Sequence, residues 1–219
     1  SEIVDDVARF REDGKRELIV LKFSHYSGFT DGAYATLVFM LQEKLGQWLY
    51  RRPVPADGHL WDIKLGEVPL EQYLADSGTV LVVCDDGYPV DITATGIWAY
   101  RDYDSATANQ GNLIVYDKYS NKLIYDKMKN DQLEKFGAYD GLCAPPHHEV
   151  TCDQFLLSWT LTPPTGVWQV SKEANRHLGE VMAQTPRHND KGFVINYLYV
   201  DYEEYSRATD VAMFMNGIT

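Results

Sequence analysis

The sequence predicts an α/β fold with parallel strands, and three observations support this prediction. Apolar runs recur along the 219-residue chain, and each is continuous rather than alternating, as in strands buried on both faces of a parallel sheet. Segments with helical periodicity separate these runs, and a β-α-β-α order implies parallel strands joined by helical crossovers. The composition, 45% hydrophobic and 24% charged, is ordinary for a packed domain.

Five runs are the expected strands. They are 16–25 (RELIVLKFSH), 78–86 (GTVLVVCDD), 111–120 (GNLIVYDKYS), 152–162 (CDQFLLSWTLT) and 192–202 (GFVINYLYVDY). The expected helices cover 1–12, about 30–50, 65–75, 121–136 and 171–184. The last of these helices should begin at Ser171 as N-cap and end before Pro186. Segment 86–110 is polar and predicts a long loop, and long loops in compact domains are often functional.

The charge and the motifs exclude several classes of function. A net charge of −12 argues against a nucleic-acid-binding protein, which needs clustered Lys and Arg. The longest apolar runs are shorter than the roughly 18 to 20 residues of a membrane helix. The chain has no nucleophile elbow, P-loop, dinucleotide fingerprint or zincin motif. It starts without Met, inside an expected helix and without a signal peptide, so a processed or truncated product is expected.

The cysteines leave two interpretations open. Cys143 and Cys152 flank a loop with two prolines and two histidines, and a disulfide between them would fit an extracellular protein. The same cysteines with His147 and His148 would alternatively supply zinc ligands, although their spacing matches no common zinc motif. Cys84 stands apart from both.

Each expected strand ends in side chains that can take part in chemistry. These are His25, Asp85 with Asp86, Asp117 with Tyr119, Ser158 with Trp159, and Asp201. Sites in (β/α) barrels and in open α/β sheets gather at the carboxyl ends of the strands. Any one such residue is more often an ordinary loop residue, but five such ends together favour a functional edge.

Several segments also resemble a known family, in collinear order. They are "RELIVLKFSH", "VYDKYSN" with "YDKMKNDQ", "LLSWTLT", "EANRHL" and "VINYLYVDY". Together they resemble the later part of the X-type barrel of phosphatidylinositol-specific phospholipase C, most closely its compact bacterial branch. The resemblance implies a TIM-type (β/α) barrel to which this chain supplies about the last five strands. Residues 1–219 would then form a single phosphodiesterase domain whose N-terminal strands are missing from this chain.

The resemblance implies a hydrolase or lyase of lipid metabolism that cleaves a phospholipid head group by histidine general acid–base catalysis. Asp201 matches a carboxylate that pairs with one histidine, holds its tautomer and favours its charged form. Asp117 and Tyr119 match positions that bind the inositol hydroxyls and stack on the ring, and their spacing would put both on one face of a strand. The candidate catalytic residues are Asp201 and His25, and the candidate substrate-binding residues are Asp117, Tyr119, Trp159 and Asp85.

The chain also departs from this family. The family's two catalytic histidines lie on segments that this chain lacks, so they would come from outside it. Phe23 stands at the calcium-ligand position of the metal-dependent relatives, so no cofactor is expected and calcium is less favoured. Where the bacterial enzymes carry an arginine to the inositol, this chain has Asp85 and Asp86. The identity of the head group is therefore open.

The expected partners are a phospholipid or inositol-phosphate-like substrate, a transient membrane surface, and a second chain or segment that completes the barrel. No nucleic acid is expected. The habit of the family and a Cys143–Cys152 bridge favour secretion, whereas the lone Cys84 counts against it. A catalytically inactive barrel that binds a lipid head group or a protein is the alternative function. An unrelated sugar-phosphate enzyme on an open sheet is a third.

Overall fold

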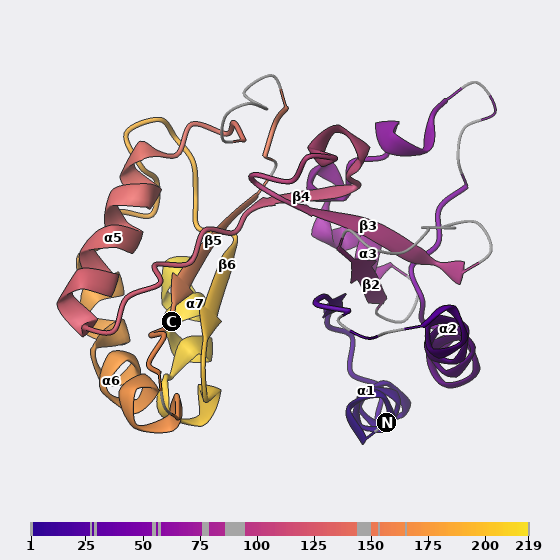
Figure 1. Ribbon diagram of the computed structural model, residues 1–219, viewed down its shortest axis with the longest axis horizontal. Coiled ribbons are helices and arrows are strands. Elements are labelled where there is room, and N and C mark those ends of the chain that lie inside the picture. The colour runs from indigo at the N-terminus through magenta and orange to yellow at the C-terminus, as the bar shows by residue number, and fades with distance from the viewer. Residues whose placement is uncertain are drawn as a thin grey trace. The chain divides into compact units, whose positions relative to one another are not determined.

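The computed structural model describes residues 2–26, 28, 30–53, 56, 58–75, 79–85, 95–143, 150–152, 154–164 and 166–218. The chain divides into two compact units, Ser1–Ile114 and Val115–Thr219, which are described separately below (Figure 1). The described strands follow one another in the hydrogen-bonded order β1-β2-β3-β4-β5-β6. The pairs β1–β2, β2–β3, β4–β5 and β5–β6 are parallel, so the predicted α/β class with parallel strands is confirmed.

Unit 1 consists of helices and parallel strands in alternation. Its elements are α1 (Glu2–Glu12), β1 (Ile19–Phe23), α2 (Asp31–Leu45), the 3-10 turns η1 (Leu60–Asp62) and η2 (Leu65–Glu67), α3 (Leu70–Leu74), β2 (Val80–Cys84), β3 (Ile97–Asp102) and η3 (Ala108–Gln110). Helix α2 begins where the Thr30 side chain accepts a hydrogen bond from the Ala33 amide, as an N-cap should. The core lies where α1 and α2 pack on the sheet, and it includes Val4, Leu41, Leu45, Val82 and Ile97.

Strand β3 corrects the prediction for segment 86–110. A long loop was predicted there, but Ile97–Asp102 forms a strand whose first five residues are buried. It pairs with β2 in parallel, with Ile97 opposite Val82. The described residues therefore hold six strands rather than five. The error arose because polar residues surround a short apolar run that is covered on both faces.

Unit 2 contains the second group of parallel strands. Strand β4 (Leu113–Tyr116) enters it from unit 1 and is followed by α5 (Tyr125–Ala138), β5 (Gln154–Trp159), α6 (Trp168–Gln184), β6 (Tyr197–Val200), η4 (Glu203–Tyr205) and α7 (Ala208–Met215). Helices α5, α6 and α7 pack against β5 and β6 (Figure 1). Aromatic rings fill this contact, because Phe155 lies 5.4 Å from Phe136 and 5.0 Å from Tyr139, centroid to centroid.

The start of α6 differs from the prediction. The helix begins at Trp168, so Ser171 lies inside its first turn and is not the N-cap. The hydroxyl of Ser171 donates to the Trp168 carbonyl oxygen at 2.9 Å, a local bond that serine makes readily within helices. The predicted end is confirmed, because α6 stops at Gln184, before Pro186. Helix α7 was not predicted.

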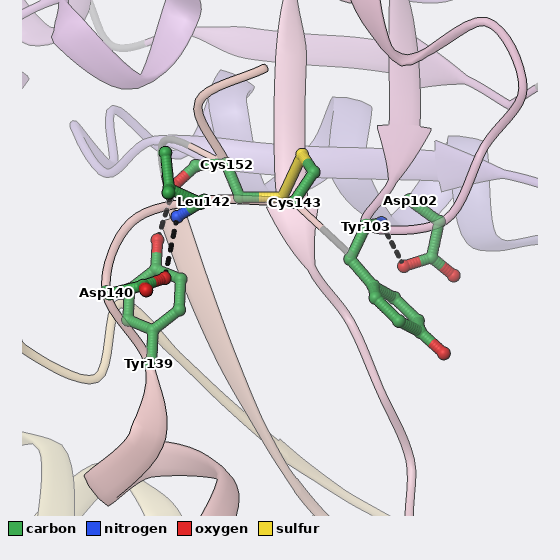
Figure 2. Close-up of a disulfide and its surroundings, with 7 residues drawn as sticks. All are labelled: Asp102, Tyr103, Tyr139, Asp140, Leu142, Cys143 and Cys152. Carbon is green, nitrogen blue, oxygen red and sulfur yellow. Dashed lines mark hydrogen bonds between the residues drawn. A yellow bond between two sulfur atoms is a disulfide. The ribbon is translucent and has the colours of Figure 1, made fainter. Parts of the chain in front are cut away.

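A disulfide joins Cys143 to Cys152, with their Cα atoms 5.1 Å apart (Figure 2). Backbone hydrogen bonds from Cys143 N to Val150 O (3.0 Å) and from Cys152 N to Gly141 O (2.9 Å) bring the two ends of this loop together. Tyr139 adds a hydrogen bond from its hydroxyl to the Cys152 carbonyl. Of the two interpretations of these cysteines, the disulfide is the one found, and bonded sulfurs are not zinc thiolates. His147 and His148 lie outside the described residues.

Replacing both cysteines with alanine should lower the free energy of unfolding by about 2 to 3 kcal/mol. The bridge closes a loop with a sequence separation of 9, and such a loop restricts the unfolded chain by about this amount. Urea unfolding of the wild type and of C143A/C152A measures the difference. A reducing agent should destabilise the wild type to the same extent and leave the double variant unchanged. A difference below about 0.5 kcal/mol would contradict the expectation.

Candidate functional site

The candidate site lies in unit 2, where β4, β5 and β6 end. Because these strands are parallel, their carboxyl ends lie at one edge of the sheet. Asp117 directly follows β4, and Asp201 directly follows β6. The last apolar run of the sequence therefore contains a strand, and that strand delivers a carboxylate to this edge.

The two faces of β5 and β6 have different surroundings. The Trp159 indole donates to the Ala174 carbonyl of α6 at 2.8 Å, and Leu198 lines a small cavity with Met182 of α6. These side chains define the helix-covered face. Because side chains alternate along a strand, Tyr199 points to the opposite face, and its register partner Ser158 points there with it.

Tyr199 lies within the electrostatic reach of both carboxylates. The pKa of its phenol is raised by burial first, then by the negative charge of Asp201 and then by that of Asp117. Both carboxylates are therefore close enough to Tyr199 to act on it electrostatically. Asp117 and Asp201 are distant in the sequence and come to the same edge of the sheet because β4 and β6 both flank β5. The Tyr199 side chain is 52% exposed, so a ligand can reach this group from solvent.

The Asp201 carboxyl is partly withdrawn from water. Burial raises its pKa above the ordinary value of an aspartate, because a buried carboxylate loses hydration. Helix α6 anchors the backbone at Asp201, because the Asn175 Nδ2 group donates hydrogen bonds to the carbonyl oxygens of Asp201 (2.7 Å) and Tyr202 (3.1 Å). Tyr202 has a φ of 56°, the left-handed conformation, so the chain turns sharply here. Asn175 therefore fixes the turn that carries Asp201.

The loop after β4 is anchored on α5. The Lys118 carbonyl accepts hydrogen bonds from Gln132 Nε2 (2.9 Å) and Lys135 Nζ (3.1 Å), and Lys135 Nζ also donates to the Tyr119 carbonyl at 3.1 Å. Strand β4 ends at Tyr116, so the prediction that Asp117 and Tyr119 share one face of a strand is wrong. Tyr119 is 58% exposed in this loop.

The other candidate residues lie elsewhere. Trp159 is fully buried in the core of unit 2, so its ring has no surface for a substrate. His25 and Asp85 belong to unit 1, and Asp86 lies outside the described residues. His25 is exposed, has a φ of 60°, and its Nδ1 lies 3.0 Å from Ser24 Oγ. Asp85 adds to the effect of burial in raising the pKa of Cys84 to about 11.

Two residues at this site were not predicted from the sequence. Tyr199 lies two positions before Asp201, and residues two apart along a strand point to the same face. This spacing could have identified Tyr199 from the sequence. Asn175 gave no such signal, because its contact with the end of β6 depends on tertiary packing. Among the described residues, no group of three or more His, Cys, Asp or Glu could hold a metal ion. No helix in the described ranges is long and apolar enough to cross a bilayer.

Comparisons with known proteins found no match for this chain. No protein-family model matches it, and neither the curated proteins nor the solved structures include a significant match.

Proposed function

We propose that unit 2 carries the head-group side of a phospholipase C-like phosphodiesterase site on a TIM-type barrel. The observation that supports this proposal is that Asp117 and Asp201 directly follow parallel strands at one edge of the sheet and both act electrostatically on Tyr199. Carboxylates accept hydrogen bonds from ring hydroxyls, and an exposed aromatic face covers the C–H surface of a ring. These groups suit a polyol such as inositol.

In the proposed reaction, a histidine supplied from outside this chain removes the proton of a ring hydroxyl. The hydroxyl oxygen then attacks the adjacent phosphorus, and the bond from phosphorus to the lipid oxygen breaks. A second histidine gives its proton to that departing oxygen. Asp201 accepts a hydrogen bond from one imidazole and favours its charged form. The raised pKa of Asp201 supports this role, because a partly desolvated carboxylate gains more from a cationic partner.

A head-group-binding module without catalysis is the second candidate function. The described histidines of unit 2 favour it, because the contacts that the structure gives them are with residues other than Asp201. His177 pairs with Glu173 on α6 at 3.4 Å, and His188 forms a bridge with Val194. Such a module would bind the head group through Asp117 and Asp201 and would not turn it over.

The proposed setting is secreted, with transient contact to a membrane surface. The Cys143–Cys152 disulfide supports this setting, because structural disulfides persist in oxidising compartments. Neither a cofactor nor calcium is part of the proposed mechanism.

Titration with myo-inositol 1-phosphate, followed by NMR chemical shifts, tests the binding part of the proposal. D117N/D201N should weaken binding by about tenfold or more, because hydrogen bonds to charged groups contribute roughly 1.5 to 3 kcal/mol each. D126N is the matched control, since Asp126 is exposed on α5 and pairs with Lys129 at 3.2 Å. Its affinity should equal that of the wild type. Equal affinity in D117N/D201N, or no binding by the wild type, would reject the proposal.

A further inference from the structure

A groove on unit 2 lies between α6 on one side and η4 with α7 on the other. Its volume is about 580 Å³, within the range of small-molecule sites. All its lining residues fall between Lys172 and Phe214, so it belongs to unit 2 alone.

The groove offers an apolar surface and open space. Val211 and Phe214 of α7 line it, and the Phe214 side chain is 49% exposed. Gly179 of α6 lies opposite, and a Cβ added there would meet only Val211 Cγ2, at 4.0 Å. The absence of a side chain at Gly179 therefore keeps the groove wide enough for an apolar body.

The groove also carries a local excess of positive charge. Its described lining residues include three cations, Lys172, Arg176 and Arg207, and two carboxylates, Glu180 and Asp210, a difference of +1. Arg207 pairs with Asp210 at 2.8 Å and Arg176 pairs with Glu173 at 3.5 Å, whereas Lys172 lies over the rings of Trp168 and Tyr205. The whole chain has a net charge of −12, so this local sign is opposite to that of the protein. An anionic group would be held here against the overall field.

The side-chain oxygen of Asn175 is a buried hydrogen-bond acceptor beside this groove. Asn175 lines the groove and is only 2% exposed. Its Nδ2 group is used by the turn after β6, whereas its Oδ1 atom accepts no hydrogen bond from any residue that the structure describes. An unpaired buried acceptor costs about 1 to 3 kcal/mol, so a donor that reached it would contribute to binding.

We propose that this groove binds a small amphipathic anion, with an apolar body and one carboxylate, sulfonate or phosphate group. The apolar body lies against Val211 and Phe214 above Gly179. The anionic group pairs with Lys172 and competes with Glu173 for Arg176. A donor on the ligand satisfies Asn175 Oδ1 after this side chain turns toward the groove, since the atom is inaccessible to solvent in the free protein.

Fluorescence titration with 8-anilinonaphthalene-1-sulfonate tests this proposal, because this probe combines an aromatic body, a sulfonate and an N–H donor. The wild type should show saturable binding that weakens as salt is added. K172M/R176M should weaken binding about tenfold, the loss expected for removing the paired charges, and G179L should abolish it by filling the groove. K127M/K129M on α5 makes the same charge change elsewhere on unit 2 and should bind as the wild type does.

Wild-type affinity in both K172M/R176M and G179L, or no saturable binding by the wild type, would overturn the proposal. Circular dichroism melting shows whether each variant is folded. If G179L lowers the melting temperature, K172M/R176M decides the outcome, because Lys172 and Arg176 are both exposed.

Discussion

Under the proposed mechanism, replacing Asp201 with asparagine should lower turnover of phosphatidylinositol by about 10²- to 10⁴-fold, the usual contribution of general acid–base catalysis. The amide keeps the size of the side chain but cannot stabilise an imidazolium. The Michaelis constant should change little, because the ring hydroxyls keep Asp117. Release of the water-soluble head group measures the rate. Unchanged turnover would remove Asp201 from the mechanism.

The same substitution should have the opposite effect on stability. Burial raises the pKa of Asp201, so the folded state binds this proton more tightly than the unfolded state does. The stability that this group contributes is therefore present at low pH and is lost as pH rises through the raised pKa. Asparagine does not ionise, so D201N should be more stable than the wild type at neutral pH and should lose this advantage in acid. Urea unfolding across this pH range measures the effect.

Replacing Arg11 with methionine should destabilise unit 1 by about 1.5 to 3 kcal/mol, because it removes the charged hydrogen-bond donor of three backbone carbonyl groups. The Arg11 side chain is 4% exposed. Its guanidinium donates to the carbonyl oxygens of Lys15 (2.7 Å), Glu17 and Thr79. These bonds join the end of α1 to the segment before β1 and to the residue before β2. Thermal and urea unfolding measure the loss.

Arg9 provides the matched control for this prediction. It lies on the same helix, α1, its side chain is 71% exposed, and it pairs with Asp6. Exposed ion pairs contribute about 0 to 1 kcal/mol, so R9M should unfold nearly as the wild type does. Equal stability of R11M and R9M would show that the Arg11 contacts contribute nothing measurable.

The strands that the sequence predicted are those with long apolar runs. Strands β2 and β5 are largely buried, so their sequences are apolar runs. Such a run can be recognised in the sequence without knowing which strands pair with it. Strand β3 was not predicted because its polar flanks resemble a loop. Its burial depends on pairing with β2, which a single sequence does not display.

The positions of the candidate site residues in the fold were predicted only in part. Asp201 was identifiable because a carboxylate directly follows an apolar strand. Trp159 was misjudged because a strand end was taken to face the site, whereas its indole bonds to α6. Asn175 was not identifiable, because the hydrogen bonds that it makes to the end of β6 exist only in the folded chain.

The amide of Asn175 has a consequence for how two ligands would influence each other. Its nitrogen holds the turn at Asp201, and its oxygen belongs to a residue that lines the groove between α6 and α7. A ligand in this groove that reorients the amide would alter its hydrogen bond to the Asp201 carbonyl oxygen. Thermodynamic linkage is reciprocal, so a head group bound at Asp201 would change the affinity of the groove by the same factor. Unit 2 would then show heterotropic cooperativity within a single subunit.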